Sequence, residues 1–247
     1  DTAGINMKGG TTGHVVAGNI ITGTGANAGA RGILLGYDCS DILIEDNAIS
    51  NWQSGIYINP SSGITIQNND IHNCWAGIGS DGISDTLITG NYFSGNTEGF
   101  GASTVGDGVS VHFNSFSGNA TGVAQYSGNA IDARYNWWGD AGGAAAGDTI
   151  AGNVDAGNWL TSSNIEQYKN SCVVTVTGIP AGGEVDIRYG QQNMANGDAV
   201  ILTKGSSIQW RLEVNGYRSP YWTHTVDWSG LVVEKEVHYC EMEISGV

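Results

Sequence analysis

Short apolar runs recur at a fixed spacing through the first 145 residues. The period is set by a glycine followed by an apolar residue, and the intervals are 23, 22, 22 and 23 residues, at Gly32-Ile33, Gly55-Ile56, Gly77-Ile78, Gly99-Phe100 and Gly122-Val123. No window has the apolar spacing of a helix, and the β-branched runs predict strands. A period this short predicts one β-helix coil per repeat, because each coil can bury its apolar side chains only against its neighbours.

An asparagine follows the second strand of each repeat, and its six copies are Asn19, Asn47, Asn69, Asn91, Asn114 and Asn136. Two positions later each repeat carries an apolar residue, namely Ile21, Ile49, Ile71, Phe93, Phe116 or Trp138. We expect the asparagines to form a ladder at a turn, with each side-chain amide bonded to the next coil. We also expect them to adopt the left-handed backbone conformation that a sharp turn needs.

The repeat stops after Gly139, and from Cys172 the chain changes to alternating strands. The pattern therefore predicts an all-β chain. It consists of a parallel β-helix of about six coils at residues 1–145, a cap or linker at 146–171, and a small β-sandwich at 172–247. Cys172 and Cys240 bracket the last domain and predict a disulfide between its first and last strands, with two free buried thiols as the alternative.

The repeat, with its closing segment Tyr135-Asn136-Trp137-Trp138-Gly139, resembles the right-handed parallel β-helix of the pectate-lyase-like superfamily, in the form found in bacterial and archaeal surface proteins. The stretch 175–183 and the later Asn215-Gly216-Tyr217 are similar to PEGA-type surface domains, although the signature quartet of those domains is missing. The first resemblance implies a fold and says little about activity, since this fold carries many functions.

The composition indicates where the protein is located and argues against several classes of partner. The formal net charge of −15, from 24 acidic and 9 basic side chains, would repel nucleic acid and anionic membrane surfaces. No apolar run is long enough for a transmembrane helix, so we expect no membrane insertion. Scarce lysine and four cysteines without a CxxC pair favour a secreted or cell-surface protein. Pairing of Cys39 with Cys74 stays open.

Catalysis finds little support in the residues. Polysaccharide lyases need a basic side chain and groups that neutralise uronates, yet residues 1–145 contain only Lys8, Arg31 and Arg134 against 12 acidic side chains. Copper-associated proteins exist in the superfamily, but the spacing of His72 and Cys74 does not predict a full ligand set. No catalytic residue is assigned.

Two weaker site hypotheses remain. Asp81, Asp85 and Asp107 lie in neighbouring glycine-rich turns, where they could hold calcium or simply form the turns. Trp52 and Trp75 occupy equivalent turns of successive coils, and two adjacent indoles could stack on sugar rings or pack against the solenoid. Apart from this optional calcium, we expect no cofactor.

The sequence favours a non-catalytic extracellular structural or adhesive protein, part of a surface layer, sheath or filament. Its partners would be further copies of itself, neighbouring surface proteins or a polysaccharide. The alternatives are a carbohydrate-binding module, or a polysaccharide lyase, hydrolase or epimerase acting on a cell-wall or matrix glycan.

Overall fold

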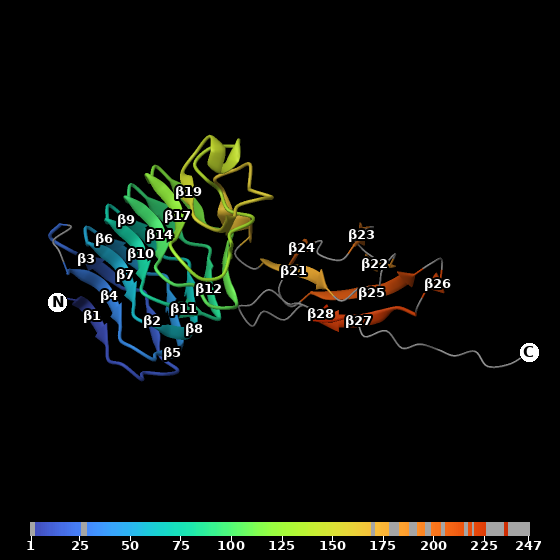
Figure 1. The fold of residues 1–247 in the computed structure, drawn as a ribbon, viewed down its shortest axis with the longest axis horizontal. Helices are drawn as coiled ribbons and strands as arrows, with labels where there is room; N and C mark the ends of the chain where they lie inside the picture. Colours follow the sequence, from blue (N-terminus) through green and yellow to red (C-terminus); the bar gives the residue numbers. More distant parts are fainter. Residues whose placement is uncertain are drawn as a thin grey trace, which may run out of the picture. The chain divides into compact units, whose positions relative to one another are not determined.

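The structure is a computed structural model that describes residues 3–25, 29–168, 171–177, 183–187, 192–195, 199–203, 206–214, 217–218, 220–225 and 235–236. The chain divides into two compact units, Asp1–Lys169 and Asn170–Val247. The first unit is a parallel β-solenoid, in which strands that follow one another along the chain lie in three different sheets (Figure 1).

Sheet A carries the Gly-apolar pairs of the repeat. Its strands, in order across the sheet, are β1 (Ala3–Met7), β4 (Arg31–Leu35), β7 (Ser54–Ile58), β10 (Ala76–Ser80), β14 (Glu98–Ala102), β17 (Thr121–Gln125) and β19 (Thr149–Ala151).

Sheet B runs from β2 (Val15–Ala17) through β5 (Ser40–Glu45), β8 (Ser61–Gln67), β12 (Thr86–Thr89), β15 (Val109–His112) and β18 (Ile131–Asp132) to β20 (Val154–Asp155), with β11 (Ile83–Ser84) also paired to β8. Sheet C contains β3 (Ile20–Thr22), β6 (Ala48–Ser50), β9 (Asp70–His72), β13 (Tyr92–Ser94) and β16 (Ser115–Ser117).

Five coils therefore carry a strand in all three sheets, close to the expected number of about six. A sixth coil has β17 and β18 and an isolated bridge between Ser115 and Trp137, and β19 and β20 add a partial seventh. Parallel pairing continues to Asp155, beyond the expected boundary at 145, and the short 3₁₀ helix η1 (Gly143–Ala145) lies within the solenoid rather than after it. A second 3₁₀ helix, η2 (Ile165–Tyr168), follows.

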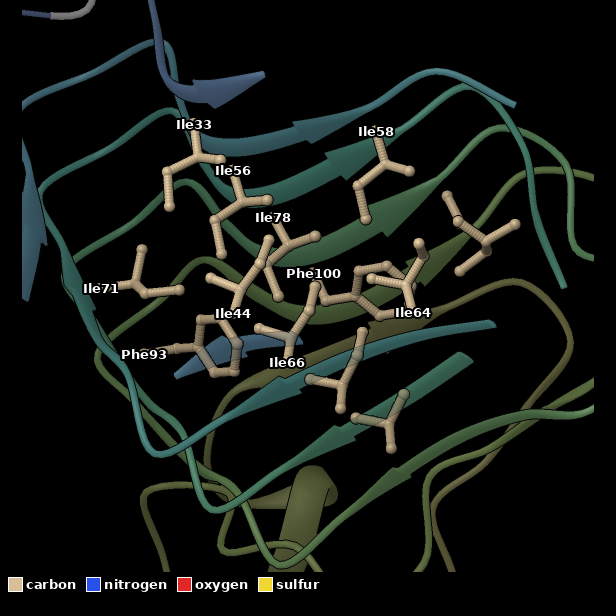
Figure 2. Packing of buried hydrophobic residues seen from close by; sticks show 14 of the residues in the cluster. Ile33, Ile44, Ile56, Ile58, Ile64, Ile66, Ile71, Ile78, Phe93 and Phe100 are labelled. Carbon is tan, nitrogen blue, oxygen red and sulfur yellow. The ribbon is translucent and has the colours of Figure 1, made fainter. Parts of the chain in front are cut away.

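The core is made of columns of apolar side chains in register. Ile33, Ile56, Ile78, Phe100 and Val123 pair across β4, β7, β10, β14 and β17, and all are fully buried. Figure 2 shows Ile33, Ile56, Ile78 and Phe100 of this column facing Ile44 and Ile66 of sheet B. In sheet C the rings stack, with 4.8 Å between the centroids of Phe93 and Phe116 and 5.0 Å between Phe116 and Trp138. Burial of each large apolar side chain contributes about 1.5–3 kcal/mol to stability.

Close packing between the corner of sheet A and sheet C explains the glycine of each repeat. A Cβ atom at Gly55 would lie 2.7 Å from the carbonyl oxygen of Gly77 and 2.7 Å from the Cγ2 atom of Ile71. No side chain fits there without moving backbone, so the repeat needs glycine immediately before its buried apolar residue.

The second unit contains two described sheets. One has the order β24 (Ala199–Thr203), β21 (Ser171–Thr177), β28 (Lys235–Glu236). The other has the order β23 (Gln192–Met194), β22 (Gly183–Ile187), β25 (Ser207–Val214), β26 (Tyr217–Arg218), with β27 (Trp222–Thr225) also paired to β25. Most of this pairing is antiparallel, and the unit is all-β; its face-to-face sandwich packing stays a prediction.

Candidate functional site

The six repeat asparagines form a continuous ladder at the turn between sheets B and C. From Asn47 onward, the side-chain oxygen of each asparagine accepts two bonds from the asparagine of the preceding coil, one from its backbone N–H and one from its amide Nδ2. At Asn69 these bonds, from Asn47, measure 3.0 and 2.9 Å. The Nδ2 group of Asn69 lies 3.0 Å from the carbonyl oxygens of both Ile44 and Gln67. Asn69, Asn91, Asn114 and Asn136 are fully buried, so every polar atom of these rungs needs such a partner.

The left-handed backbone at this turn belongs to the residue before each asparagine, which corrects the expectation that the asparagine itself would adopt it. The positive φ angles are 53° at Asp46, 56° at Asn68, 66° at Gly90, 57° at Phe113 and 59° at Tyr135. The asparagine is then free to keep the geometry that aims its amide along the solenoid. Phe113 and Tyr135 tolerate the conformation with their rings stacked, their centroids 6.1 Å apart.

A second, shorter ladder lies at the turn between sheets C and A, and the sequence reasoning missed it. Asn96 donates from its backbone N–H and its Nδ2 to Asn119 Oδ1 at 3.0 and 2.9 Å. Asn119 in turn donates to Asp148 Oδ2. The backbone N–H of Gly118 donates to Asp148 Oδ1 at 2.9 Å. Burial outweighs these bonds and raises the pKa of Asp148. The available signal was the Gly-Asn pair at Gly95-Asn96 and Gly118-Asn119, 23 residues apart.

Cys74 begins this second ladder, since its backbone N–H donates to Asn96 Oδ1 at 2.9 Å. Its thiol is buried, and that burial raises its pKa. Cys39 is also buried, and both cysteines are free, so no disulfide joins them. The expected Cys172–Cys240 disulfide lies outside the residues whose side chains are described.

A charged cluster occupies the outward side of sheet B. Arg134 donates to both carboxylate oxygens of Asp132, at 2.8 and 2.7 Å, and His112 Nε2 lies 3.1 Å from Asp132 Oδ1. Burial alone would raise the pKa of Asp132, but bonding to Arg134 and His112 outweighs it and holds that pKa well below its usual range. Arg134 is therefore engaged in an ion pair.

The three aspartates proposed for calcium each occupy a separate local role. Asp81 accepts a 2.6 Å bond from the Tyr57 hydroxyl, and Asp107 accepts a 2.7 Å bond from Asn129 Nδ2. Asp85 has a φ of 45° and donates its N–H to the Asp107 carbonyl. Across the described ranges, no three His, Cys, Asp or Glu side chains are placed to hold one metal ion. Calcium binding here stays a prediction, and the positive φ favours the turn-forming alternative for Asp85.

The two tryptophans lie in successive coils, where Trp75 N–H donates to the Trp52 carbonyl at 3.1 Å. Their environments differ. Trp52 packs against the core over Gly23, and its Nε1 donates to the Ile21 carbonyl at 3.2 Å, whereas Trp75 is 48% exposed. Only Trp75 leaves a large ring surface in solvent, so a platform of two indoles stays a prediction that rests on one exposed ring.

A comparison with known protein families identifies the family of this solenoid. The model of the family described as "Periplasmic copper-binding protein (NosD)" matches residues 1–159. The chain belongs to the NosD family. Searches of the curated proteins and of the solved structures produced no match.

Membership of the NosD family bears on the expected location. The family is described as periplasmic, which agrees with an extracytoplasmic protein, whether periplasmic or extracellular. None of the helices in the described part of the chain is long and apolar enough to span a membrane.

Proposed function

We propose that this chain is a non-catalytic structural scaffold, with the β-helix as its rigid rod. The observation that supports the proposal is the continuity of the bonding along the solenoid axis. The first ladder links six successive coils through buried side-chain amides. Phe93, Phe116 and Trp138 stack along the same direction beside it. Coils joined in this way resist separation and bending, because either motion would break buried hydrogen bonds that water cannot replace.

The family description raises copper binding, so we tested the donors of this solenoid against a copper centre. Copper sites bring soft or imidazole donors together, and cysteine binds metal as the thiolate. Burial raises the pKa of Cys74, which opposes thiolate formation, and His112 is held by Asp132. In the ranges that the structure describes, no group of three His, Cys, Asp or Glu residues converges.

These donors do not fit a copper site, and we assign no copper chemistry to the β-helix. The side chains of several further soft donors lie outside the described residues, namely Cys172, Met194, His224, His238, Cys240 and Met242.

Two measurements on the full chain test the scaffold proposal. Incubation with a panel of neutral and uronate polysaccharides, with and without calcium, should release no reducing ends and no unsaturated uronate; product from any one of them would contradict the non-catalytic role. Single-molecule pulling should unfold the solenoid at a lower force in the Asn69→Ala variant than in the parent chain. Equal forces would contradict the role given to the ladder.

A further inference from the structure

A polar groove crosses the turns between sheets A and B and serves none of the roles described above. It encloses about 450 Å³. We call it the serine groove, and the residues that line it include Asp38, Ser40, Pro60, Ser62, Ser84 and Thr104. These come from four successive coils, so the groove runs parallel to the solenoid axis. It is a different surface from the corner that carries Trp52 and Trp75, which lies between sheets C and A.

The floor of the groove is a row of hydroxyl groups in register. Ser40 pairs with Ser62 across β5 and β8, and Ser62 pairs with Ser84 across β8 and β11. Neighbouring strands are about 4.8 Å apart, so the hydroxyls repeat at that interval along the groove. Ser40 donates to Thr12 Oγ1 at 3.0 Å. Within the described chain, the hydroxyls of Ser62 and Ser84 have no hydrogen-bond partner, which leaves them available to a ligand.

The backbone at the groove is already paired from coil to coil. Asp38 N–H donates to the Pro60 carbonyl at 2.8 Å, and Ile83 N–H donates to the Thr104 carbonyl at 3.2 Å. An extended peptide binds best by adding to a free strand edge, and these turns provide none. The groups that remain are side-chain hydroxyls and the exposed Asp38 carboxylate, which suit a ligand rich in hydroxyl groups.

An exposed tyrosine is adjacent in sequence to a groove residue at one end of the groove. Tyr37, 61% exposed, directly precedes Asp38 in the second coil. Tyr126 is also exposed, but its hydroxyl donates to Glu98 of β14 and its ring lies near Gly101, so its side chain belongs to sheet A rather than to the groove. Tyrosine presents an apolar ring face together with a polar tip, the combination that stacks on a sugar ring and bonds its hydroxyls.

Charge limits the kind of sugar. The groove lining contains the Asp38 carboxylate and no lysine or arginine, and the whole chain has a net charge of −15. The negative charge would therefore repel a polyuronate, whereas a neutral sugar chain could hydrogen-bond to the groove without this repulsion. We propose that the serine groove binds an uncharged glycan chain lying parallel to the solenoid axis.

Calorimetric titration of the full chain tests this, with cellohexaose, xylohexaose and mannohexaose as neutral probes and hexagalacturonate as the anionic probe. We expect at least one neutral probe to bind, and hexagalacturonate to bind at least tenfold more weakly. The double variant Ser62→Ala/Ser84→Ala should weaken the neutral complex about tenfold, which corresponds to about 1.4 kcal/mol. Tyr37→Ala should weaken it further.

The matched control is Ser94→Ala/Ser117→Ala, which removes two exposed hydroxyls from sheet C and should leave affinity unchanged. Thermal unfolding of every variant separates lost binding from lost folding. The proposal is overturned if no neutral probe binds at millimolar concentration, if hexagalacturonate binds equally well, or if the groove variants bind like the control. Loss of binding in Trp75→Ala with intact binding in the groove variants would place the glycan at the other corner.

Discussion

Removal of one buried rung is the sharpest test of how this solenoid is held together. Asn69→Ala deletes a fully buried amide in the middle of the ladder. The change leaves Asn47 N–H and Nδ2 without their 3.0 and 2.9 Å acceptor, and it takes the Nδ2 donor away from the carbonyls of Ile44 and Gln67. Each buried polar group left without a partner costs about 1–3 kcal/mol.

Some of these groups keep a second partner. Asn47 Nδ2, for example, also donates to the carbonyls of Val16 and Glu45 at 2.9 Å. We therefore expect the free energy of unfolding to fall by about 2–5 kcal/mol, which corresponds to roughly one to two unsatisfied groups. For a chain of this length that corresponds to a decrease in Tm of roughly 2–4 °C per kcal/mol.

Urea and thermal unfolding, followed by circular dichroism, measure the loss. The matched control is Asn153→Ala, because Asn153 is exposed and its side chain makes no hydrogen bond among the described residues. We expect the control to stay within about 0.5 kcal/mol of the parent. Asn19→Ala, at a partly exposed rung, should be intermediate. If Asn69→Ala were no less stable than Asn153→Ala, the ladder would not hold the coils together and the reasoning would fail.

Three further predictions concern the stack, the charged cluster and the thiols. Phe116→Ala breaks the aromatic column between Phe93 and Trp138. It should lower the free energy of unfolding, measured with urea, by about 3–5 kcal/mol. A decrease below about 1 kcal/mol would mean that the surrounding side chains collapse into the cavity. The pKa of Asp132 is lowered in the fold, so its contribution to stability is complete above the ordinary value of 3.8 and is lost as pH falls from there through the lowered pKa. Asp132→Asn should therefore destabilise the chain at pH 7 and destabilise it clearly less at pH 2; an equal effect at both pH values would contradict the ion pair. Cys39→Ala/Cys74→Ala should leave the copper content after dialysis against the metal unchanged, as measured by elemental analysis, and a lower content would show that the β-helix supplies ligands.

The regular spacing of the repeat allowed much of this solenoid to be predicted from the sequence. A coil must repeat at nearly constant length for its strands to pair with those of the next coil, so the recurring Gly-Ile pairs and the asparagines specify the architecture and the position of the ladder. The same regularity distinguishes Ile56 and Ile78, which face the core, from the residues that follow them. The membership of the chain in a β-helix family follows from the same repeat.

Features that depend on irregular turns were decided only by the tertiary structure. The positive φ falls on the residue before the asparagine, for example Asp46 or Phe113, and because such different residue types fill that position the sequence did not indicate which residue would adopt it. The second ladder ends at Asp148, which follows Asn119 by 29 residues. Because this separation is longer than one period, the repeat did not indicate that Asp148 would be the last member of the ladder.

The same limit applies to the candidate sites. Asp81 and Asp107 look alike in sequence, yet the Asp81 carboxylate accepts a bond from the Tyr57 hydroxyl, 24 residues away, and that of Asp107 from Asn129 Nδ2, 22 residues away, because the partner depends on the turn in which each side chain lies. The sequence indicates the serine row in part, since Ser40, Ser62 and Ser84 recur every 22 residues, whereas the groove over them is seen only in the folded chain. The sequence by itself determined the coil and its interior, where packing imposes the period. Only the folded chain determined the partners of the polar side chains that lie outside this repeat, because turn length and backbone conformation vary from coil to coil.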